Sequence, residues 1–454
     1  MLKPFDLRAV FEMQGSFWRP DTPSTNFPGR LIGHKHRIEL VTAPSLTNIG
    51  DVTELPGGEA RIDVLHGLTT SGPCTLFWLQ SAAPKGLTDF DTDQSLSFRE
   101  YRVALCVFGS HIPDSTRPVL RSVCCRYSGL SEWLPVRPQR SETEKHIVLI
   151  HAKDTPPVFD VCVRNLKARI RFDIIPYFTH RSTGEYHTRN DVQLLVEPSN
   201  PQSLEWFLDL AYRLENLFSL LLGVSICLRS VALDEDAAWV VQRVRYDPQK
   251  VHPMLWITCS AADLVRTLLL WLSTPAEFRS LENLIYGTMR NTSAFVETEF
   301  LSLAQAIESF HRLTDASTVA HPRCFRDILK SLQEETDHLC AGTKLAARLN
   351  ESMQYANEPN FRMRIENLIA RMNQEQQKQL LGDPKEFEQT LRQTRNNLTH
   401  PGITKKAKVL TKPKELFLFN QKLRAFLRLL MLMHVGFASH SVFEPVLYQA
   451  KRWH

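Results

Sequence analysis

The pattern of apolar and polar positions changes character near residue 200. Before it, short runs of β-branched and aromatic residues are separated by Gly, Pro, Ser and Asp. Such runs predict strands, and the clearest are Arg37–Val41, Ala60–Leu65, Cys74–Leu79, Tyr101–Phe108 and His146–Ile150. A hairpin is expected between Arg169–Phe178 and Tyr186–Val196. Residues 1–200 therefore predict an antiparallel, sandwich-like β domain.

Helical spacing of apolar residues begins after Ser203. Leu204, Phe207, Ala211 and Leu214 lie on one face of a predicted helix. A second helix is expected over residues 261–272, and residues 239–244 favour a strand. We interpret residues 201–290 as a mostly helical connecting region.

From about Phe295 onward the chain predicts helices only. The expected helices include residues 325–339, 343–353, 362–381 and 414–435. Residues 291–454 therefore form a predicted all-α bundle of about 150 residues. The whole chain is predicted to be α+β.

The segment Asp383-Pro384-Lys385-Glu386 carries the signals of a helix start. Asp383 can cap, Pro384 suits the first helical position, and Glu386 stands where a capping box needs an acid. Pro401 disfavours helical geometry at the residue before it, so we expect this helix to weaken near His400.

Composition and charge narrow the class of protein. Hydrophobic residues make up 43% and charged residues 23%, which is typical of globular proteins, and the net charge is +5. The nine cysteines form no CxxC and no Cys/His metal spacing, which favours a reducing compartment. The first ten residues lack a signal-peptide core, and the apolar runs are too short to span a bilayer. We expect a cytoplasmic protein with no membrane contact, no metal and no cofactor.

An Arg-x4-His arrangement occupies residues 395–400, late in the helix that starts at Asp383. The same spacing recurs from Arg61 to His66, within an alternating segment that predicts a strand, and we interpret that copy as chance. A free imidazole titrates near pH 6.5, so His400 suits general acid or base catalysis. Arg395 offers a planar, permanently charged fork to phosphate oxygens.

The spacing of the two side chains raises a geometric question. On a straight helix Arg395 and His400 lie about 140° apart. Either the helix loosens before Pro401, or two chains pool their residues across an interface, and we favour the second. A purely structural explanation also exists, because Arg and His suit a helix carboxy terminus and Pro-Gly commonly ends a helix.

Three segments resemble a known family. Residues 395–400 match the Arg-Asn-x-x-x-His motif of HEPN ribonucleases. The segment Ala306–Arg312 resembles the first HEPN helix of the ApeA group of bacterial abortive-infection proteins. Gly15–Trp18, followed by Pro28–Leu31, resembles the opening of their amino-terminal domain. The resemblance covers most of the chain.

This resemblance implies a function. HEPN domains are helical and usually dimeric, and catalytic members cut RNA without a metal in a cleft shared by two motifs. Members of the ApeA type act against phage by cleaving host RNA such as transfer RNA. Carried over, Arg395 and His400 are the catalytic pair and Asn396 is an auxiliary polar residue. Residues 1–200 would then be a sensing domain for a phage-derived trigger.

Five further residues are candidates for supporting roles. Lys405, Lys406 and Lys408 lie in a lysine-rich segment that suits an RNA backbone, although such runs are often only solvated. Glu308 and Arg312 could contact the motif, or form an ordinary surface pair. The alternative function is a non-catalytic, ligand- or protein-binding sensor whose HEPN bundle only dimerises.

Overall fold

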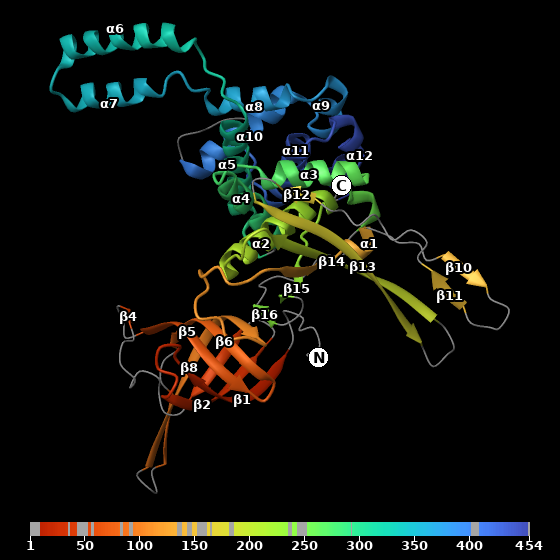
Figure 1. Ribbon diagram of the computed structural model, residues 1–454. Helices are drawn as coiled ribbons and strands as arrows, with labels where there is room; N and C mark the ends of the chain where they lie inside the picture. The colour runs from red at the N-terminus through yellow and green to blue at the C-terminus, as the bar shows by residue number, and fades with distance from the viewer. Residues whose placement is uncertain are drawn as a thin grey trace. The chain divides into compact units, whose positions relative to one another are not determined.

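The computed structural model divides into two compact units, residues 1–273 and 274–454, each described here by itself (Figure 1). The residues that it describes are 10–34, 37–42, 53–55, 59–81, 85–89, 94–133, 139–142, 148–151, 161–163, 166–180, 186–234, 238–242, 252–291, 293–400 and 408–452.

The first unit begins with six antiparallel strands that close on themselves. Each strand pairs with the next, and the last pairs with the first, so they form a closed sheet. In the order of pairing these strands are β1 (Phe11–Trp18), β2 (Asn26–Gly33), β3 (Ile38–Thr42), β8 (Gln94–Phe108), β6 (Gly72–Ser81) and β5 (Glu59–Thr69). They are the red and orange strands of Figure 1.

Glycines let the closed sheet turn tightly around Phe17. Burial alternates along β1, and Phe17 points into the core with no exposed surface. A Cβ at Gly67 would lie 2.6 Å from the Phe17 ring, and one at Gly15 would lie 2.6 Å from the Leu68 carbonyl oxygen. A Cβ at Gly29, which lies opposite Gly15 on β2, would lie 3.1 Å from the Phe17 ring. Strands bend and approach closely where side chains are missing.

The sheet extends from β8 through a second set of strands. The order continues β16, β15, β9, β14, β13 and β12. Their bounds are β9 (Val123–Tyr127), β12 (Val161–Val163), β13 (Ala168–His180), β14 (Tyr186–Pro198), β15 (Leu228–Leu233) and β16 (Ala238–Gln242). The shorter strands are β4 (Thr53–Leu55), β7 (Lys85–Asp89), β10 (Gln139–Glu142) and β11 (Val148–His151).

Helix α2 (Leu204–Leu222) packs against this extension of the sheet. Ser203 accepts from the Trp206 amide at its start, and Gly223 ends it at φ 68°. The buried Tyr127 hydroxyl of β9 donates to the Ala211 carbonyl at 2.9 Å. The other helical segments of this unit are α1 (Leu130–Trp133), the 3₁₀ turn η2 (Pro253–Leu255) and α3 (Ala261–Leu272).

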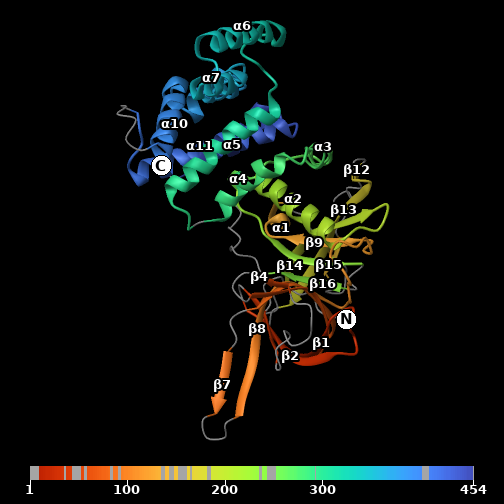
Figure 2. The same cartoon turned by 90° about the vertical axis from the view of Figure 1, so that its left-hand side faces the viewer.

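Helices are the only regular secondary structure among the described residues of the second unit (Figure 2). Its helices are α4 (Phe278–Arg290), α5 (Val296–Thr314), α6 (Pro322–Cys340), α7 (Lys344–Gln354), α8 (Phe361–Ile369), α9 (Gln374–Leu380), α10 (Pro384–Thr399), α11 (Pro413–His434) and α12 (Ser439–Lys451). The core of this bundle is aromatic and aliphatic, with Phe300, Phe310 and Phe426 fully buried. Both figures show α6 and α7 projecting from the rest of the unit.

The predicted α+β class is confirmed, and so is the long hairpin, because β13 and β14 pair over thirteen residues. The single helix expected over residues 362–381 is wrong. It divides into α8 and α9, because Asn373 caps a new helix by a reciprocal capping box with Gln376. None of the described helices has the length and hydropathy needed to cross a bilayer.

Candidate active site

Helix α10 carries the Arg-x4-His motif on a well-anchored scaffold. Asp383 accepts from the amides of Lys385 (2.8 Å) and Glu386 (3.3 Å), so the predicted cap is present. Glu386 departs from the predicted capping box, because its carboxylate pairs with Lys408. Phe387, on the buried face of α10, stacks on Phe419 with ring centroids 5.3 Å apart. The helix is therefore fixed at its start and along one face.

The motif ends where the helix ends. Thr399 is the last helical residue, and His400 has φ −135° and ψ 73°. The His400 amide still donates to the Asn396 carbonyl at 2.9 Å. The helix thus stops one residue before Pro401, and His400 has left the helical geometry that proline disfavours in the residue before it. The sequence left two alternatives open, and we favoured the pooling of residues between two chains. The structure shows the other alternative, a helix that ends before Pro401, and pooling stays a prediction.

Arg395 is held from two directions. Its Nη2 donates to Glu308 Oε2 of α5 at 3.1 Å. Its Cζ lies 4.5 Å from the centroid of the Phe361 ring at the start of α8, which is a cation–π contact. The side chain keeps 29% of its surface exposed. Within the described part of the chain Nη2 alone is hydrogen-bonded, so Nε and Nη1 are free to bind a phosphate.

His400 and Asn396 are less constrained than Arg395. His400 is exposed and Asn396 is half-buried. Among the described residues the imidazole has no hydrogen-bond partner. The motif therefore combines an oriented cation with an imidazole that can turn toward a ligand.

An alternating chain of charges continues from Glu308, and we call it the charge network. Glu308 Oε1 also accepts from Arg312 at 3.4 Å, and Arg312 reaches Glu358 Oε2 at 2.6 Å. Glu358 Oε2 accepts a second hydrogen bond from Arg364 Nη2 at 3.0 Å. Arg312 therefore supports Glu308 and has no direct contact with Arg395 among the described residues.

The charge network ends at a buried histidine. Arg364 Nη1 donates to His311 Nδ1 at 3.2 Å, and because guanidinium only donates, Nδ1 is unprotonated. His311 Nε2 lies 3.2 Å from Asn367 Nδ2 and 3.6 Å from Asp315. Burial lowers the pKa of His311 below its ordinary value, and burial also lowers the pKa of Arg364. For His311 this shift favours the neutral imidazole.

The predicted lysine cluster is only partly described. Lys408 pairs with Glu386 near the start of α10. Lys405 and Lys406 lie outside the described residues. The structure therefore associates one of the three predicted lysines with α10, at the end of the helix opposite to His400.

The second Arg-x4-His copy lies in β5, as its alternating pattern predicts. Arg61 pairs with Asp63 at 3.0 Å. His66 stacks on His111 with ring centroids 4.7 Å apart, and the Trp18 ring meets His111 edge-on. Both motif residues thus have structural neighbours of their own.

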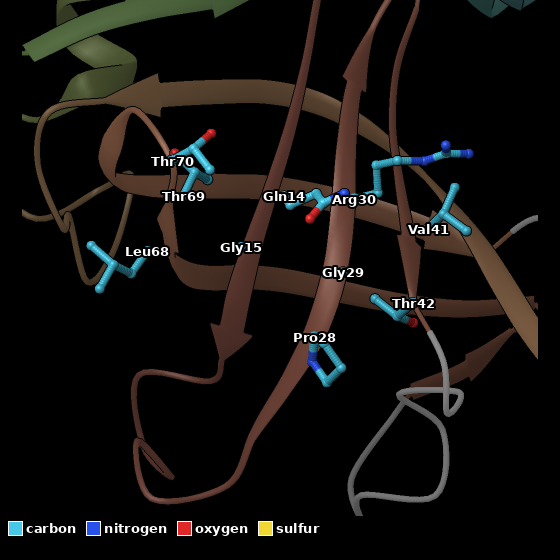
Figure 3. Close-up of a pocket in the computed structure, with 10 residues that line it drawn as sticks. All are labelled: Gln14, Gly15, Pro28, Gly29, Arg30, Val41, Thr42, Leu68, Thr69 and Thr70. Atoms are coloured by element: carbon cyan, nitrogen blue, oxygen red, sulfur yellow. The ribbon is translucent and has the colours of Figure 1, made fainter.

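The first unit contains a depression on its closed sheet, with a volume of about 750 Å³ (Figure 3). It is lined by Gln14, Gly15, Pro28, Gly29, Arg30, Val41, Thr42, Leu68, Thr69 and Thr70. Gly15 and Gly29 pair across β1 and β2 and give it a backbone floor. The Thr42 hydroxyl is buried and has no hydrogen-bond partner among the residues that the structure describes. Among the described residues that line the depression, Arg30 is the one charged side chain.

Sequence reasoning missed the residues that position Arg395 from α8. The helix predicted over 362–381 began one residue after Phe361, and Glu358 lies in the preceding turn. The Asn360 cap, whose side chain accepts from the Met363 amide at 3.0 Å, is the signal that would have placed the helix start correctly. The described residues contain no group of three His, Cys, Asp or Glu side chains arranged to hold a metal.

Comparison with protein families gives two matches. The ApeA N-terminal domain 1 family matches residues 12–253, which is more than half of the chain. The Apea-like HEPN family matches residues 301–441 and includes Glu308, Arg395 and His400. No curated protein and no solved structure gives a significant match. The chain therefore belongs to the ApeA-like HEPN abortive-infection proteins.

Proposed function

We propose that this anti-phage defence protein is an endoribonuclease that cuts host RNA, with transfer RNA as the proposed substrate. The observation that carries the proposal is the state of Arg395. Glu308 and Phe361 orient its guanidinium, two of whose nitrogens have no hydrogen-bond partner among the described residues, five residues before an exposed imidazole. An oriented cation beside a titratable group suits phosphoryl-transfer chemistry.

The proposed reaction is an internal transesterification. His400 takes the proton from an RNA 2′-hydroxyl, and the 2′-oxygen attacks the adjacent phosphorus. The bond from phosphorus to the 5′-oxygen breaks, and that oxygen receives a proton. Arg395 binds the phosphate oxygens, where negative charge grows in the transition state. The products are a 2′,3′-cyclic phosphate and a 5′-hydroxyl, and these steps need no metal ion.

We propose that two copies of the chain share one cleft. His400 lies outside helical geometry and is exposed, so it can approach an Arg395 from another copy as readily as its own. Two imidazoles in one cleft would supply both the base and the acid that the reaction needs. Asn396 is the proposed auxiliary residue that orients His400 or the phosphate.

The test is cleavage of total cellular RNA in the presence of EDTA. Wild type is expected to cut, and Arg395→Ala and His400→Ala should each be at least about 100-fold slower. Arg362→Ala and His440→Ala, which change exposed residues outside the motif, should match wild type. A plain 3′-hydroxyl on the products would contradict the transesterification.

The alternative is a non-catalytic sensor whose helical unit only dimerises. The depression in Figure 3 favours a binding role for the first unit, with a phage-derived trigger as the proposed ligand. Cutting that survives both motif substitutions would remove these residues as the site. If wild type cuts no RNA, before or after phage challenge, the sensor alternative is supported.

A further inference from the structure

A pocket of about 360 Å³ lies in the helical unit, where α9, α11 and α12 pack together (Figure 1). Two of its lining residues, Leu380 of α9 and Ala450 of α12, are buried. The other described residues that line it are Lys378, Gln379, Gly382, Lys422 and Lys451. Its described lining therefore contains three lysines and no carboxylate, and we call it the lysine pocket.

Each of the three helices contributes one lysine to the lysine pocket. Lys378 belongs to α9, Lys422 to α11 and Lys451 to α12. Lys378 and Lys451 are exposed, and Lys422 is half-buried. Within the described part of the chain none of these three lysines forms an ion pair. The helical unit also contains lysines that do pair with an acid, namely Lys330, Lys408 and Lys412.

The acids that flank the lysine pocket in the sequence have other partners. Glu375, three residues before Lys378, accepts from Gln379 Nε2 at 2.6 Å. Asp383, which follows Gly382, accepts from two amides at the start of α10. The three ammonium groups therefore repel one another with no described side chain to compensate them. An anion bound in the lysine pocket would offset this repulsion.

The helix dipole accounts for two of the three lysine positions. Lys378 lies in the last turn of α9 and Lys451 in the last turn of α12, where a cation is favoured. Lys422 lies in the middle of α11, away from both ends of that helix, so the dipole gives no reason for a lysine there. A shared anionic ligand accounts for all three positions together.

We propose that the lysine pocket binds backbone phosphates of RNA and is a docking site separate from the candidate active site. The choice of RNA as the ligand rests on the proposed function. The pocket includes Gly382, directly before the Asp383 cap of α10, whereas His400 lies at the opposite end of that helix. The 16 residues of α10 span about 24 Å. An RNA bound at both places is therefore selected by its length and shape.

Lysines suit this role because an ammonium group on a flexible stem binds phosphate oxygens as a point charge. Contacts to phosphates position an RNA without reading its bases. The lysine pocket should therefore strengthen the binding of a large folded RNA, and this contribution should depend strongly on salt. Each lysine–phosphate contact contributes about 0.7–0.9 to the slope of log K against log salt concentration.

The experiment measures the binding of bulk transfer RNA to the full chain over a series of salt concentrations. All proteins carry His400→Ala and EDTA is present, so that the RNA stays intact. Lys378→Gln/Lys451→Gln should reduce the salt slope by about 1.5 and weaken binding about tenfold at low salt. The matched control Lys330→Gln/Lys344→Gln removes the same charge from exposed lysines of α6 and α7 and should keep the slope of the parent protein. All four lysines are exposed, so the circular dichroism of both variants should stay unchanged.

A small phosphorylated ligand would use the same chemistry, so calorimetry with pyrophosphate distinguishes the two sources. Pyrophosphate binding that needs Lys378 and Lys451, with equal transfer RNA slopes in variant and control, would replace RNA by a small anion and overturn the proposal. It is also overturned if the parent protein binds no transfer RNA, or if both variants lose the same slope. The expected slopes without RNA cleavage by wild type would contradict the proposed function alone.

Discussion

Two neighbouring parts of the second unit use similar helices in opposite ways. Around Arg395, helices α5, α8 and α10 surround the inner end of the charge network, where Arg364 and His311 are both buried, whereas Arg312 and Glu358 stay exposed. In the next segment of the chain, α6 and α7 expose leucines to solvent and keep their charges outside. Polar groups are inside in the first region and apolar groups are outside in the second.

In the region around Arg395 the side chains stabilise the fold, whereas in α6 and α7 the exposed apolar side chains remain available to a partner. A buried arginine is tolerated where its guanidinium finds acceptors, and Arg364 Nη1 and Nη2 find them in His311 and Glu358. An exposed leucine row costs little in an isolated chain but retains its full hydrophobic free energy for association. Rigidity is thus concentrated near Arg395, and association potential in the hairpin formed by α6 and α7.

The largest expected difference between the two regions is in stability. Phe310→Ala in α5 removes a fully buried ring and should lower the free energy of unfolding by about 3–5 kcal/mol. Ile328→Ala in α6 should change it by no more than about 0.5 kcal/mol at concentrations where the chain is monomeric. Chemical denaturation followed by circular dichroism measures both. Equal effects would show that the hairpin is packed within one chain.

A smaller effect is expected for catalysis when the support of Arg395 is weakened. Glu308→Gln keeps an oxygen acceptor but removes the charge that pairs with Arg395, so RNA cleavage should fall about tenfold. Glu366→Gln, which alters an exposed pair with Arg362, is the matched control and should cut like wild type. If Glu308→Gln cuts at the wild-type rate, the ion pair has no role in placing the guanidinium.

The smallest expected effect is on pH dependence. Burial lowers the pKa of His311 in the folded chain. The unfolded chain therefore protonates this imidazole near pH 6.5, whereas the folded chain protonates it only at lower pH. Stability should therefore fall as pH drops below about 6.5, until the lowered pKa of the folded state is reached. In His311→Gln the melting temperature should fall less as the pH drops below about 6.5. The control His440→Gln, which changes an exposed histidine, should show the same fall as wild type. Identical slopes for all three proteins would rule out His311 as the source.

The sequence predicted much of the scaffold of the second unit. Apolar periodicity located α5, α6, α7 and α11 within a few residues, and the Asp383-Pro384 pair marked the start of α10 correctly. Periodicity records which residues are apolar, not what covers them, so it could not distinguish the packed α5 from the uncovered α6. Helix α12 was not predicted, because Pro445 lies inside it.

Sequence reasoning identified only part of the candidate site. The Arg395–His400 spacing and the possible contact of Glu308 follow from local pattern. Phe361 does not, because its place under the guanidinium depends on how α8 packs across α10, a contact between distant parts of the chain. In the first unit, short strands were evident, but their closure through β5 and β1 depends on pairings that no local pattern encodes.

The hairpin begins and ends at one point. Asn357 accepts from the Val319 amide with its carbonyl (2.9 Å) and from the Ala320 amide with its side chain (2.7 Å). These two hydrogen bonds hold together the points at which the chain leaves the helical bundle and returns to it. An insertion closed in this way can be lengthened, shortened or exchanged without re-routing the rest of the chain. The segment between residues 320 and 357 is accordingly an insertion whose length and sequence the rest of the bundle does not dictate.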